Sequence, residues 1–382
     1  MDIAPKNLVF ISMTNYAGGA ENILAMLAKI TSSPIIFQKK VRASGLVLSP
    51  EIDAKFLTTK SLLWGFILLL KSLIKYRTGY TIVSTHPYLN AFLGLLKRVG
   101  FIKSSLIVRE CTSVFTRFTG LKKLSYQIAY KLGYPAVNLI ICQTDAMRRQ
   151  LLESNDFINS NRAVVIPNPI DLKSVFKRAD ADVTEDLDEV EYICSAGRLI
   201  SEKGFDILIK AFAEMAPLNP ALKLFILGEG KERQYLEDLI AELNLINRVE
   251  LKGHIKNPVP YFKKAKLCVV SSIKEGFPNV LLEMMAVNPH VVSTLCAGGI
   301  KDIPSIIKLQ PGDVEALTEA MESGLEPRIY VAESVSEYLN NRSPDAFVAT
   351  LSKYTEMLHE VKIVNMFTGK FYYLRSSALS NQ

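Results

Sequence analysis

The sequence predicts an α/β protein with two tandem, doubly wound Rossmann-like domains that face each other across a cleft. Short apolar runs rich in β-branched residues alternate with helical patterns in both halves of the chain, which is typical of parallel sheets covered by helices. The length of 382 residues is too great for one ordinary core and fits two domains of roughly 150–200 residues each. Ligands of such folds bind at the carboxyl ends of the strands.

The first half predicts four buried parallel strands, at 7–12, 80–85, 105–110 and 138–143. The stretches between them predict helices at 20–30, 61–75, 89–99 and 122–132. The same alternation restarts in the second half, with strands predicted at 192–197, 222–228, 248–253, 266–272 and 290–294.

The domain boundaries follow from the charged stretch at 173–191, which has almost no apolar periodicity and is predicted as a linker. We therefore expect an acceptor-side first domain over 1–172 and a second domain over 192–355. A tail over 356–382 could pack back on the first domain.

The composition indicates the cellular environment in which the protein is expected. The five cysteines are widely spaced in apolar stretches without a CxxC pair, which favours a reducing, cytoplasmic environment. The N-terminus lacks the pattern of a signal peptide. The apolar run LLWGFILLL at 62–70 is about half of the roughly 20 residues that a membrane-spanning helix needs. A helix packed on the sheet and a helix that touches a bilayer surface both stay open for it.

Charge is distributed unevenly along the chain. Residues 1–178 hold 24 Lys and Arg against 9 Asp and Glu, whereas the remaining 204 residues hold 21 against 29. A basic half suits nucleic acid, anionic lipid or phosphate-bearing substrates equally well on electrostatic grounds. The lysines are scattered over helices, and no strand has the aromatic and basic interleaving of single-strand binders, so nucleic acid is not the expected partner.

Several common active-site motifs do not occur in the sequence. There is no GxGxxG after the first strand, no GKS or GKT P-loop, no GxSxG and no HExxH. The DAD triplet at 180–182 lies in the predicted linker with no strand leading into it, so a solvated charge run is favoured over a metal site.

Two loops between a strand and a helix are candidate phosphate sites. Gly18 and Gly19 lie in YAGGAEN, where the backbone could approach a ligand and helix amides could hold an anion. A simple tight turn is the alternative. Arg198 and Lys203 flank the loop AGRLISEKGFD, from which two cations could neutralise a diphosphate.

A third loop, SSIKEGFPNVLLEMMA at 271–286, places Glu275 before a bend and Glu283 in the helix that the bend starts. The helix N-terminus near Asn279 suits a phosphate. Glu275 could bind hydroxyls above it, and Glu283 could bind a ribose diol, although either glutamate alone is more often a surface residue. In a fourth loop, His86 follows the 80–85 strand and is expected either to be structural or to touch substrate.

Taken together, these segments resemble the retaining, GT-B-fold glycosyltransferases of the family 4 type. The E-x7-E pattern is present as Glu275-GFPNVLL-Glu283, and GRLISEKGFDILIKAFA, LGEGKERQYLEDLIAELNL, GHIKNPVPYFKKAKLCVVSS and PNPID are similar to family segments in the same order. The resemblance covers nearly the whole chain, is strongest from 163 to 303, and depends on GGAE and THP in the first half.

The resemblance implies roles for individual residues. Glu275, His86, Arg198 and Lys203 are implied to be catalytic. The implied donor-binding positions are Gly18, Gly19, Arg198, Lys203, Glu275, Gly276, Phe277, Asn279, Val280 and Glu283. No metal and no cofactor are implied beyond the nucleoside-diphosphate sugar that serves as donor.

The implied reaction transfers a hexose or N-acetylhexosamine, with UDP favoured as carrier, to a lipid-linked or oligosaccharide acceptor in surface-polysaccharide or lipopolysaccharide synthesis. The implied location is cytoplasmic, peripheral on the inner face of an anionic membrane. A nucleotide-sugar epimerase or a phosphorylase on the same fold, and a non-enzymatic nucleic-acid-binding protein, are the alternatives. CAGGIKDIP at 296–304 replaces the Pro-Ser-Gly-Pro-type turn of many relatives with polyprenyl-linked acceptors, which leaves the donor sugar open.

Overall fold

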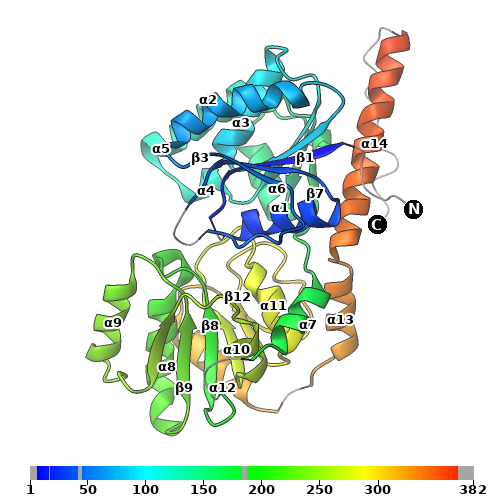
Figure 1. The fold of residues 1–382 in the computed structure, drawn as a ribbon. Coiled ribbons are helices and arrows are strands. Elements are labelled where there is room, and N and C mark those ends of the chain that lie inside the picture. Colours follow the sequence, from blue (N-terminus) through cyan, green and yellow to red (C-terminus); the bar gives the residue numbers. More distant parts are fainter. Residues whose placement is uncertain (1–6, 17, 42–44, 183–186, 328, 369–382) are drawn as a thin grey trace.

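Two parallel β-sheets, each covered by helices on both faces, make up the protein in a computed structural model (Figure 1). The described residues are 7–16, 18–41, 45–182, 187–327 and 329–368, with side chains described as far as residue 357. This architecture confirms the predicted fold class.

The first sheet has seven strands in the order β3-β2-β1-β4-β5-β6-β7. All neighbours are parallel, and Val9 of β1 lies opposite Ile82 of β4. The strands are β1 (Leu8–Thr14), β2 (Ile35–Lys39), β3 (Ala54–Thr58), β4 (Thr81–Thr85), β5 (Ser105–Glu110), β6 (Leu139–Cys142) and β7 (Ala163–Val165). The four strands predicted in this half are confirmed, while β2, β3 and β7 were not predicted.

The second sheet has six strands in the order β10-β9-β8-β11-β12-β13. Cys194 of β8 lies opposite both Phe225 of β9 and Cys268 of β11. The strands are β8 (Tyr192–Ala196), β9 (Lys223–Leu227), β10 (Val249–Gly253), β11 (Leu267–Val270), β12 (Val291–Thr294) and β13 (Ile307–Leu309). The five strands predicted here are confirmed, and the three-residue edge strand β13 is an addition.

Helices cover the first sheet in two layers. One layer contains α2 (Leu62–Leu73), α3 (Pro87–Arg98), α5 (Gly120–Gly133) and α6 (Asp145–Glu153); the short helix α4 (Val114–Arg117) precedes α5. Within this layer the backbones of α3 and α5 lie in contact at Gly94 and Gly133. A Cβ at Gly94 would lie only 2.3 Å from the carbonyl oxygen of Gly133, so this close packing requires glycine. The other layer contains α1 (Gly19–Ile30) and the start of α14 (Pro344–Thr368).

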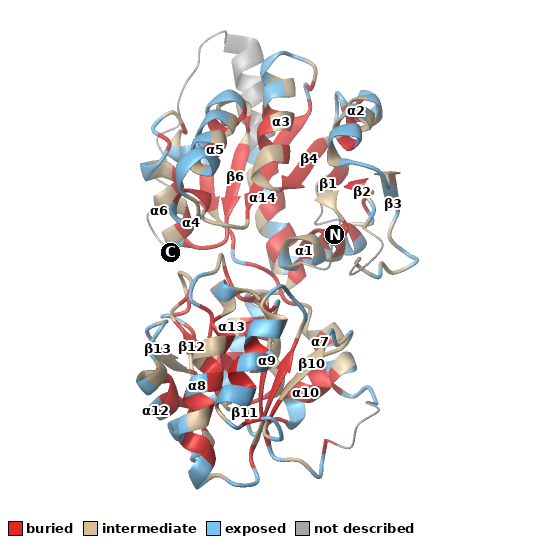
Figure 2. Cartoon of the chain, turned by 90° about the vertical axis from the view of Figure 1, so that its left-hand side faces the viewer, coloured by how far each residue is buried: buried red, intermediate tan, exposed pale blue. Residues whose placement is uncertain are grey.

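The second sheet is covered in the same way. One face carries α8 (Phe205–Met215), α9 (Arg233–Glu242) and α12 (Val314–Leu325). The other face carries α7 (Leu172–Ala179), α10 (Val259–Lys264), α11 (Asn279–Val287) and α13 (Ala332–Asn340). Figure 2 shows the buried sheet of each half between helices that are exposed on their outer sides.

The predicted linker begins with an ordered helix. Val175 and Ala179 of α7 are buried in the core of the second half, so the segment 172–179 packs there instead of hanging between the domains. The helix was not predicted because charged residues surround its two apolar positions in the sequence. Residues 183–186 of the predicted linker lie outside the described residues.

The chain returns to the first half near its end. Phe347, Val348 and Leu351 of α14 are buried in the core around α1, and Figure 1 shows α14 running alongside the first half. This packing starts before residue 356, where the tail was expected to begin. The backbone N–H of Ile170 donates to the carbonyl of Arg342 at 2.8 Å, so the two crossings of the chain are bonded to each other. Residues 369–382 of the expected tail lie outside the described residues.

Candidate active site

The loops that follow the strands of both sheets come together at one junction. Arg117, after β5, donates to Glu202, after β8, at 2.6 Å. Lys274, after β11, donates to the carbonyl of Thr116 at 2.9 Å. The two sheets therefore present their carboxyl ends to each other, which is where ligands of doubly wound folds bind.

The stretch from Glu275 to Glu283 leads from β11 into α11 through a bend. Asn279 is the first residue of α11, directly after Pro278, so the predicted helix start is confirmed. Gly276 lies so close to the first half that a Cβ there would be 2.3 Å from the carbonyl oxygen of Cys111. Phe277 is buried in the second core, and Val280 packs partly buried against it. The bend is thus fixed by steric contact on both sides.

Glu275 and Lys203 form an ion pair at the junction. Lys203 Nζ lies 2.8 Å from Glu275 Oε1, and each side chain is only 15% exposed. Ser272 Oγ donates to the same carboxylate oxygen. Lys203 ends a short 3-10 turn, Ser201–Lys203, and Gly204 follows with φ +62° and no room for a Cβ, which would lie 2.4 Å from the carbonyl oxygen of Ser271. The turn directs the Lys203 side chain toward Glu275. Lys203 and Ser272 both bond to Oε1 of Glu275, so its Oε2 has no bond to either of them.

Glu283 lies four residues after Asn279, about 6 Å further along the helix axis at 1.5 Å per residue. Its Oε1 accepts a hydrogen bond from Arg178 Nη2 of α7 at 2.7 Å. The side chains remain about one-third exposed, so the ion pair is open to solvent and to a ligand. Arg178 was not predicted as a site residue.

The predicted glycine pair starts α1. Gly18 precedes the helix and Gly19 is its first residue. A Cβ at Gly19 would lie 2.7 Å from Asn279 Nδ2, and one at Gly18 would lie 2.6 Å from Glu21 Oε2. The first turns of α1 and α11 therefore meet across the junction, with the Asn279 side chain against the backbone of Gly19.

Arg198 follows β8 and is exposed. Its charge acts on Glu21 in the first turn of α1: burial raises the pKa of the Glu21 carboxyl, and the Arg198 and Arg109 charges partly offset this. No hydrogen-bond partner for the Arg198 side chain occurs within the part of the chain that the structure describes, so the guanidinium can turn toward a ligand. The charge of Arg198 therefore acts on the helix that the glycine pair starts.

His86 directly follows β4 and precedes α3. Its backbone has φ +89°, a conformation that is costly for a residue with a side chain and that is concentrated at functional sites. Burial lowers the pKa of the imidazole to about 4, so the ring is neutral near pH 7. Its buried Nδ1 has no hydrogen-bond partner among the described residues.

The junction also contains polar residues that the sequence reading missed. Arg109 near the end of β5 and Asn168 between the halves are both 1% exposed. Arg109 Nη2 donates to Asn168 Oδ1 at 2.9 Å, and Asn168 Nδ2 donates to Asn279 Oδ1 at 2.7 Å. Two features of the sequence could have indicated these residues: Arg109 lies inside the apolar strand SLIVRE, and Asn168 lies between two prolines.

Two further features concern metals and membranes. The described residues hold no group of three or more His, Cys, Asp and Glu side chains placed to share a metal ion. Within the same residues, no helix combines the length and the apolar character needed to cross a bilayer.

Comparison with known proteins agrees with this geometry. Residues 176–342 match the family model of the glycosyl transferases group 1. The chain is 30% identical over 303 residues to the N-acetylgalactosamine-N,N'-diacetylbacillosaminyl-diphospho-undecaprenol 4-alpha-N-acetylgalactosaminyltransferase of Campylobacter jejuni, covering 75% of this chain and 80% of the relative. It is 27% identical to the lipopolysaccharide core biosynthesis glycosyltransferase LpsE of Rhizobium meliloti, covering 60% of this chain and 68% of that protein.

Among solved structures, the Anabaena protein Alr3699/HepE in complex with UDP is similar with a TM-score of 0.72 and 17% identity. The superposition covers 93% of this chain and 100% of the Anabaena chain. At this identity the likeness establishes the shared two-sheet fold.

Proposed function

Because the chain belongs to the group 1 glycosyl transferases of the GT-B superfamily, we propose that it moves a hexose or N-acetylhexosamine from a UDP-sugar to a lipid-linked or saccharide acceptor. The observation that carries the proposal is the meeting of two helix N-termini, at Gly19 and Asn279, beside the Lys203–Glu275 pair. UDP is favoured because the Anabaena structure contains it.

The donor diphosphate binds between the first turns of α1 and α11. Free amides and the positive dipole end of a helix both favour an anion. Arg198 turns toward the phosphates, and Lys203 stabilises the charge that builds on the leaving nucleotide. These cations and the helix ends supply the positive charge that a metal ion would otherwise bring, so we propose a metal-independent reaction.

Glu275 and Glu283 bind the two sugars on either side of the diphosphate. The Glu275 oxygen that is not bonded to Lys203 and Ser272 accepts hydrogen bonds from donor-sugar hydroxyls. Glu283, held by Arg178, accepts from the ribose diol. The neutral imidazole of His86 lies beside the reacting sugar, where its unpartnered Nδ1 can exchange a hydrogen bond with a hydroxyl.

The proposed transfer retains the anomeric configuration. The acceptor oxygen attacks on the face from which the nucleotide leaves, and the departing phosphate takes the acceptor's proton. His86 is too weak a base, with a pKa of about 4, to remove that proton at neutral pH. The protein's part is to orient donor and acceptor and to stabilise the diphosphate.

A lipid-linked acceptor is supported by the first half of the molecule, because its outer helical layer suits an anionic membrane. Between Asp53 and Asp145 the sequence has 13 lysines and arginines and one acidic residue, Glu110; Glu110 and one of the cations, Arg109, are buried. A surface with this balance attracts anionic lipid headgroups.

Apolar side chains are exposed on the same layer. On α5, Leu121, Leu124, Ile128 and Leu132 are 85%, 49%, 52% and 47% exposed, at a spacing that places them along one side of the helix. On α2, Leu63, Trp64 and Ile67 are exposed, whereas Leu69 is fully buried. We define these seven side chains as the apolar face. The 62–70 segment thus packs on the sheet with one side and offers the other to lipid.

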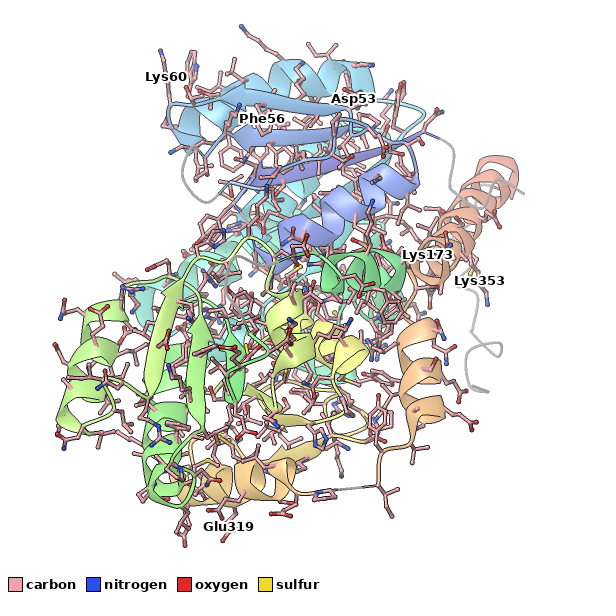
Figure 3. The ribbon with its side chains drawn as sticks, turned by 60° about the horizontal axis from the view of Figure 1, so that its bottom comes forward. Asp53, Phe56, Lys60, Lys173, Glu319 and Lys353 are labelled. Carbon is pink, nitrogen blue, oxygen red and sulfur yellow. The ribbon has the colours of Figure 1, made fainter. Side chains whose placement is uncertain are left out.

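The membrane proposal also fits the charge asymmetry. Figure 3 places Lys60, beside α2, and Glu319, on α12, at opposite ends of the molecule. The acidic half therefore stays away from an anionic bilayer when the apolar face rests on it. Each basic residue near such a surface contributes about 1 kcal/mol, so attachment is weak and sensitive to salt.

A thermal-shift screen of UDP, GDP and ADP and their sugars tests the donor assignment. A ligand at 100 times its dissociation constant stabilises the folded protein by about 2.7 kcal/mol. We expect the largest shift with UDP or a UDP-sugar. A shift with none of these ligands would contradict the function, and a UDP-sugar converted to its epimer would favour the epimerase.

Sedimentation with vesicles tests the membrane face. We expect pelleting with anionic vesicles at low salt, less at high salt, and loss of pelleting in Leu121→Glu/Ile128→Glu. Leu218→Glu, at an 80% exposed site in the second half, is the matched control and should pellet normally. Equal pelleting of both variants, or self-association without vesicle binding, would contradict the proposal.

A further inference from the structure

A hydrogen-bonded chain connects the two halves of the molecule at the junction; it is buried at its Arg109 end and exposed at its Gly19 end. Arg109 Nη2 donates to Asn168 Oδ1 at 2.9 Å, Asn168 Nδ2 donates to Asn279 Oδ1 at 2.7 Å, and Asn279 Nδ2 donates to the carbonyl of Gly19 at 3.4 Å. We call these four residues the relay. It runs from the first sheet, through the crossing segment, to the start of α11 and back to the start of α1.

The direction of the relay follows from the chemistry of its first member. A guanidinium can donate hydrogen bonds but cannot accept them. Asn168 must therefore turn its oxygen toward Arg109, which directs its NH₂ group to Asn279. Asn279 must in turn accept with its oxygen, which directs its own NH₂ group to Gly19. One arginine thus sets the orientation of two amide side chains.

Burial of Arg109 and Asn168 fixes the orientation of the Asn168 amide. Arg109 and Asn168 are each 1% exposed, so water does not compete for their hydrogen bond. A reversed Asn168 amide would face the guanidinium with a second donor and Asn279 Oδ1 with a second acceptor. Arg109 is held from other sides as well, with its guanidinium 5.7 Å from the Phe347 ring centroid of α14. Its Nε and Nη1 have no hydrogen-bond partner within the described residues, so Asn168 is the one acceptor there that anchors it.

We propose that Arg109 is a positioning residue that acts through Asn168 and Asn279 to hold the first turns of α1 and α11 together. This proposal rests on the proposed function in one respect, because it takes the first turns of α1 and α11 as the place where the donor diphosphate binds. Arg109 itself does not contact the donor. Its effect is to keep the amides of both helix ends directed at one anion.

The variant Asn168→Asp separates positioning from stability. The new carboxylate accepts from Arg109 and gives the buried cation a counter-charge, so the melting temperature should not fall. However, a carboxylate cannot donate to Asn279. Asn279 must then turn its NH₂ group toward residue 168 and its oxygen toward the Gly19 carbonyl, which removes the hydrogen bond between Asn279 and Gly19.

We expect two effects of Asn168→Asp. Without ligand, hydrogen exchange of the 18–24 amides should speed up, because the first turn of α1 loses its tie to α11. The affinity for UDP should fall by about tenfold, the loss expected for misplacing one or two hydrogen bonds. In an Asn279→Ala background, Asn168→Asp should have no further effect on UDP affinity, because the relay is already cut.

Asn155→Asp is the matched control. Asn155 is also buried in the first half, 2% exposed, and its Nδ2 donates to the Leu151 carbonyl, outside the relay. This variant should change neither exchange of the 18–24 amides nor UDP affinity, even where it lowers stability. Unchanged exchange and unchanged affinity in Asn168→Asp would overturn the relay. If wild-type protein does not bind UDP at all, the proposed donor fails, and the exchange measurement alone still decides on the relay.

Discussion

Replacing Lys203 by alanine is the most informative single change at the Lys203–Glu275 pair. Both side chains are only 15% exposed, with 2.8 Å between Nζ and Oε1. In the alanine variant, water therefore compensates poorly for the lost ammonium group. Charge-assisted hydrogen bonds of this kind contribute about 1.5–3 kcal/mol. At about 1.4 kcal/mol for each factor of ten, Lys203→Ala should lower turnover at least tenfold.

The structure also predicts how this loss combines with a change in Glu275. Glu275→Gln removes the negative charge but keeps the side-chain shape. Because the two residues contact each other, the double variant should lose less activity than the two single losses multiplied together. If the lysine acted on the diphosphate without Glu275, the two effects would be independent and would multiply.

The assay is steady-state release of UDP, with kcat and KM measured separately and thermal unfolding used to verify that each variant is folded. Lys210→Ala is the control, because Lys210 is an exposed lysine of the neighbouring helix α8 outside the site. Near-wild-type turnover in both Lys203→Ala and Arg198→Ala would refute the assignment of the cationic loop.

Four other variants test the rest of the site. Glu283→Ala should weaken UDP binding by about tenfold through loss of the ribose contact, and Arg178→Ala should weaken it less; calorimetry that gives the opposite order would contradict these roles. Gly204→Ala should lower the unfolding free energy by more than about 1 kcal/mol, because the backbone has φ +62° and a Cβ would meet the Ser271 carbonyl; an unchanged urea midpoint would contradict this. Since the folded pKa of His86, about 4, is below its ordinary value near 6.5, the unfolded chain binds more protons between these values and stability should rise with pH across that range. His86→Asn should lack this component, so an identical pH dependence in the variant would count against it.

Much of the fold could be predicted because parallel strands that are buried on both faces are read directly from apolar runs. The missed strand β2 has four of its five residues buried, so it carries this signal and was overlooked. Two other missed strands lie where the signal is weak. β3 contains no buried residue, and β13 has only three residues, none of them buried. Helix α7 was missed because a charged sequence surrounds its two buried side chains, Val175 and Ala179.

The placement of the candidate site could be predicted for a similar reason. Loops that follow parallel strands lie at the carboxyl edge of their sheet, which is why His86, Arg198 and Glu275 were expected at the cleft between the two sheets. Their partners could not be predicted, because the pairs are distant in sequence: Arg178 and Glu283 are 105 residues apart, and Asn168 and Asn279 are 111 apart. The first contact depends on how α7 and α11 pack side by side on the second sheet, and the second on how the two halves meet. No local pattern in the sequence encodes either arrangement.

The central claim, transfer of a sugar from UDP to a lipid-linked acceptor, is tested most directly by following a radiolabelled sugar. The protein would be incubated with the labelled UDP-sugar and a polyprenyl-diphosphate-linked saccharide in anionic vesicles, and the lipid and water fractions would be separated. We predict that label enters the lipid fraction in step with UDP release, and that Lys203→Ala slows both at least tenfold. UDP release with all label left in the water fraction as free sugar, or no consumption of any UDP-sugar, would contradict the claim.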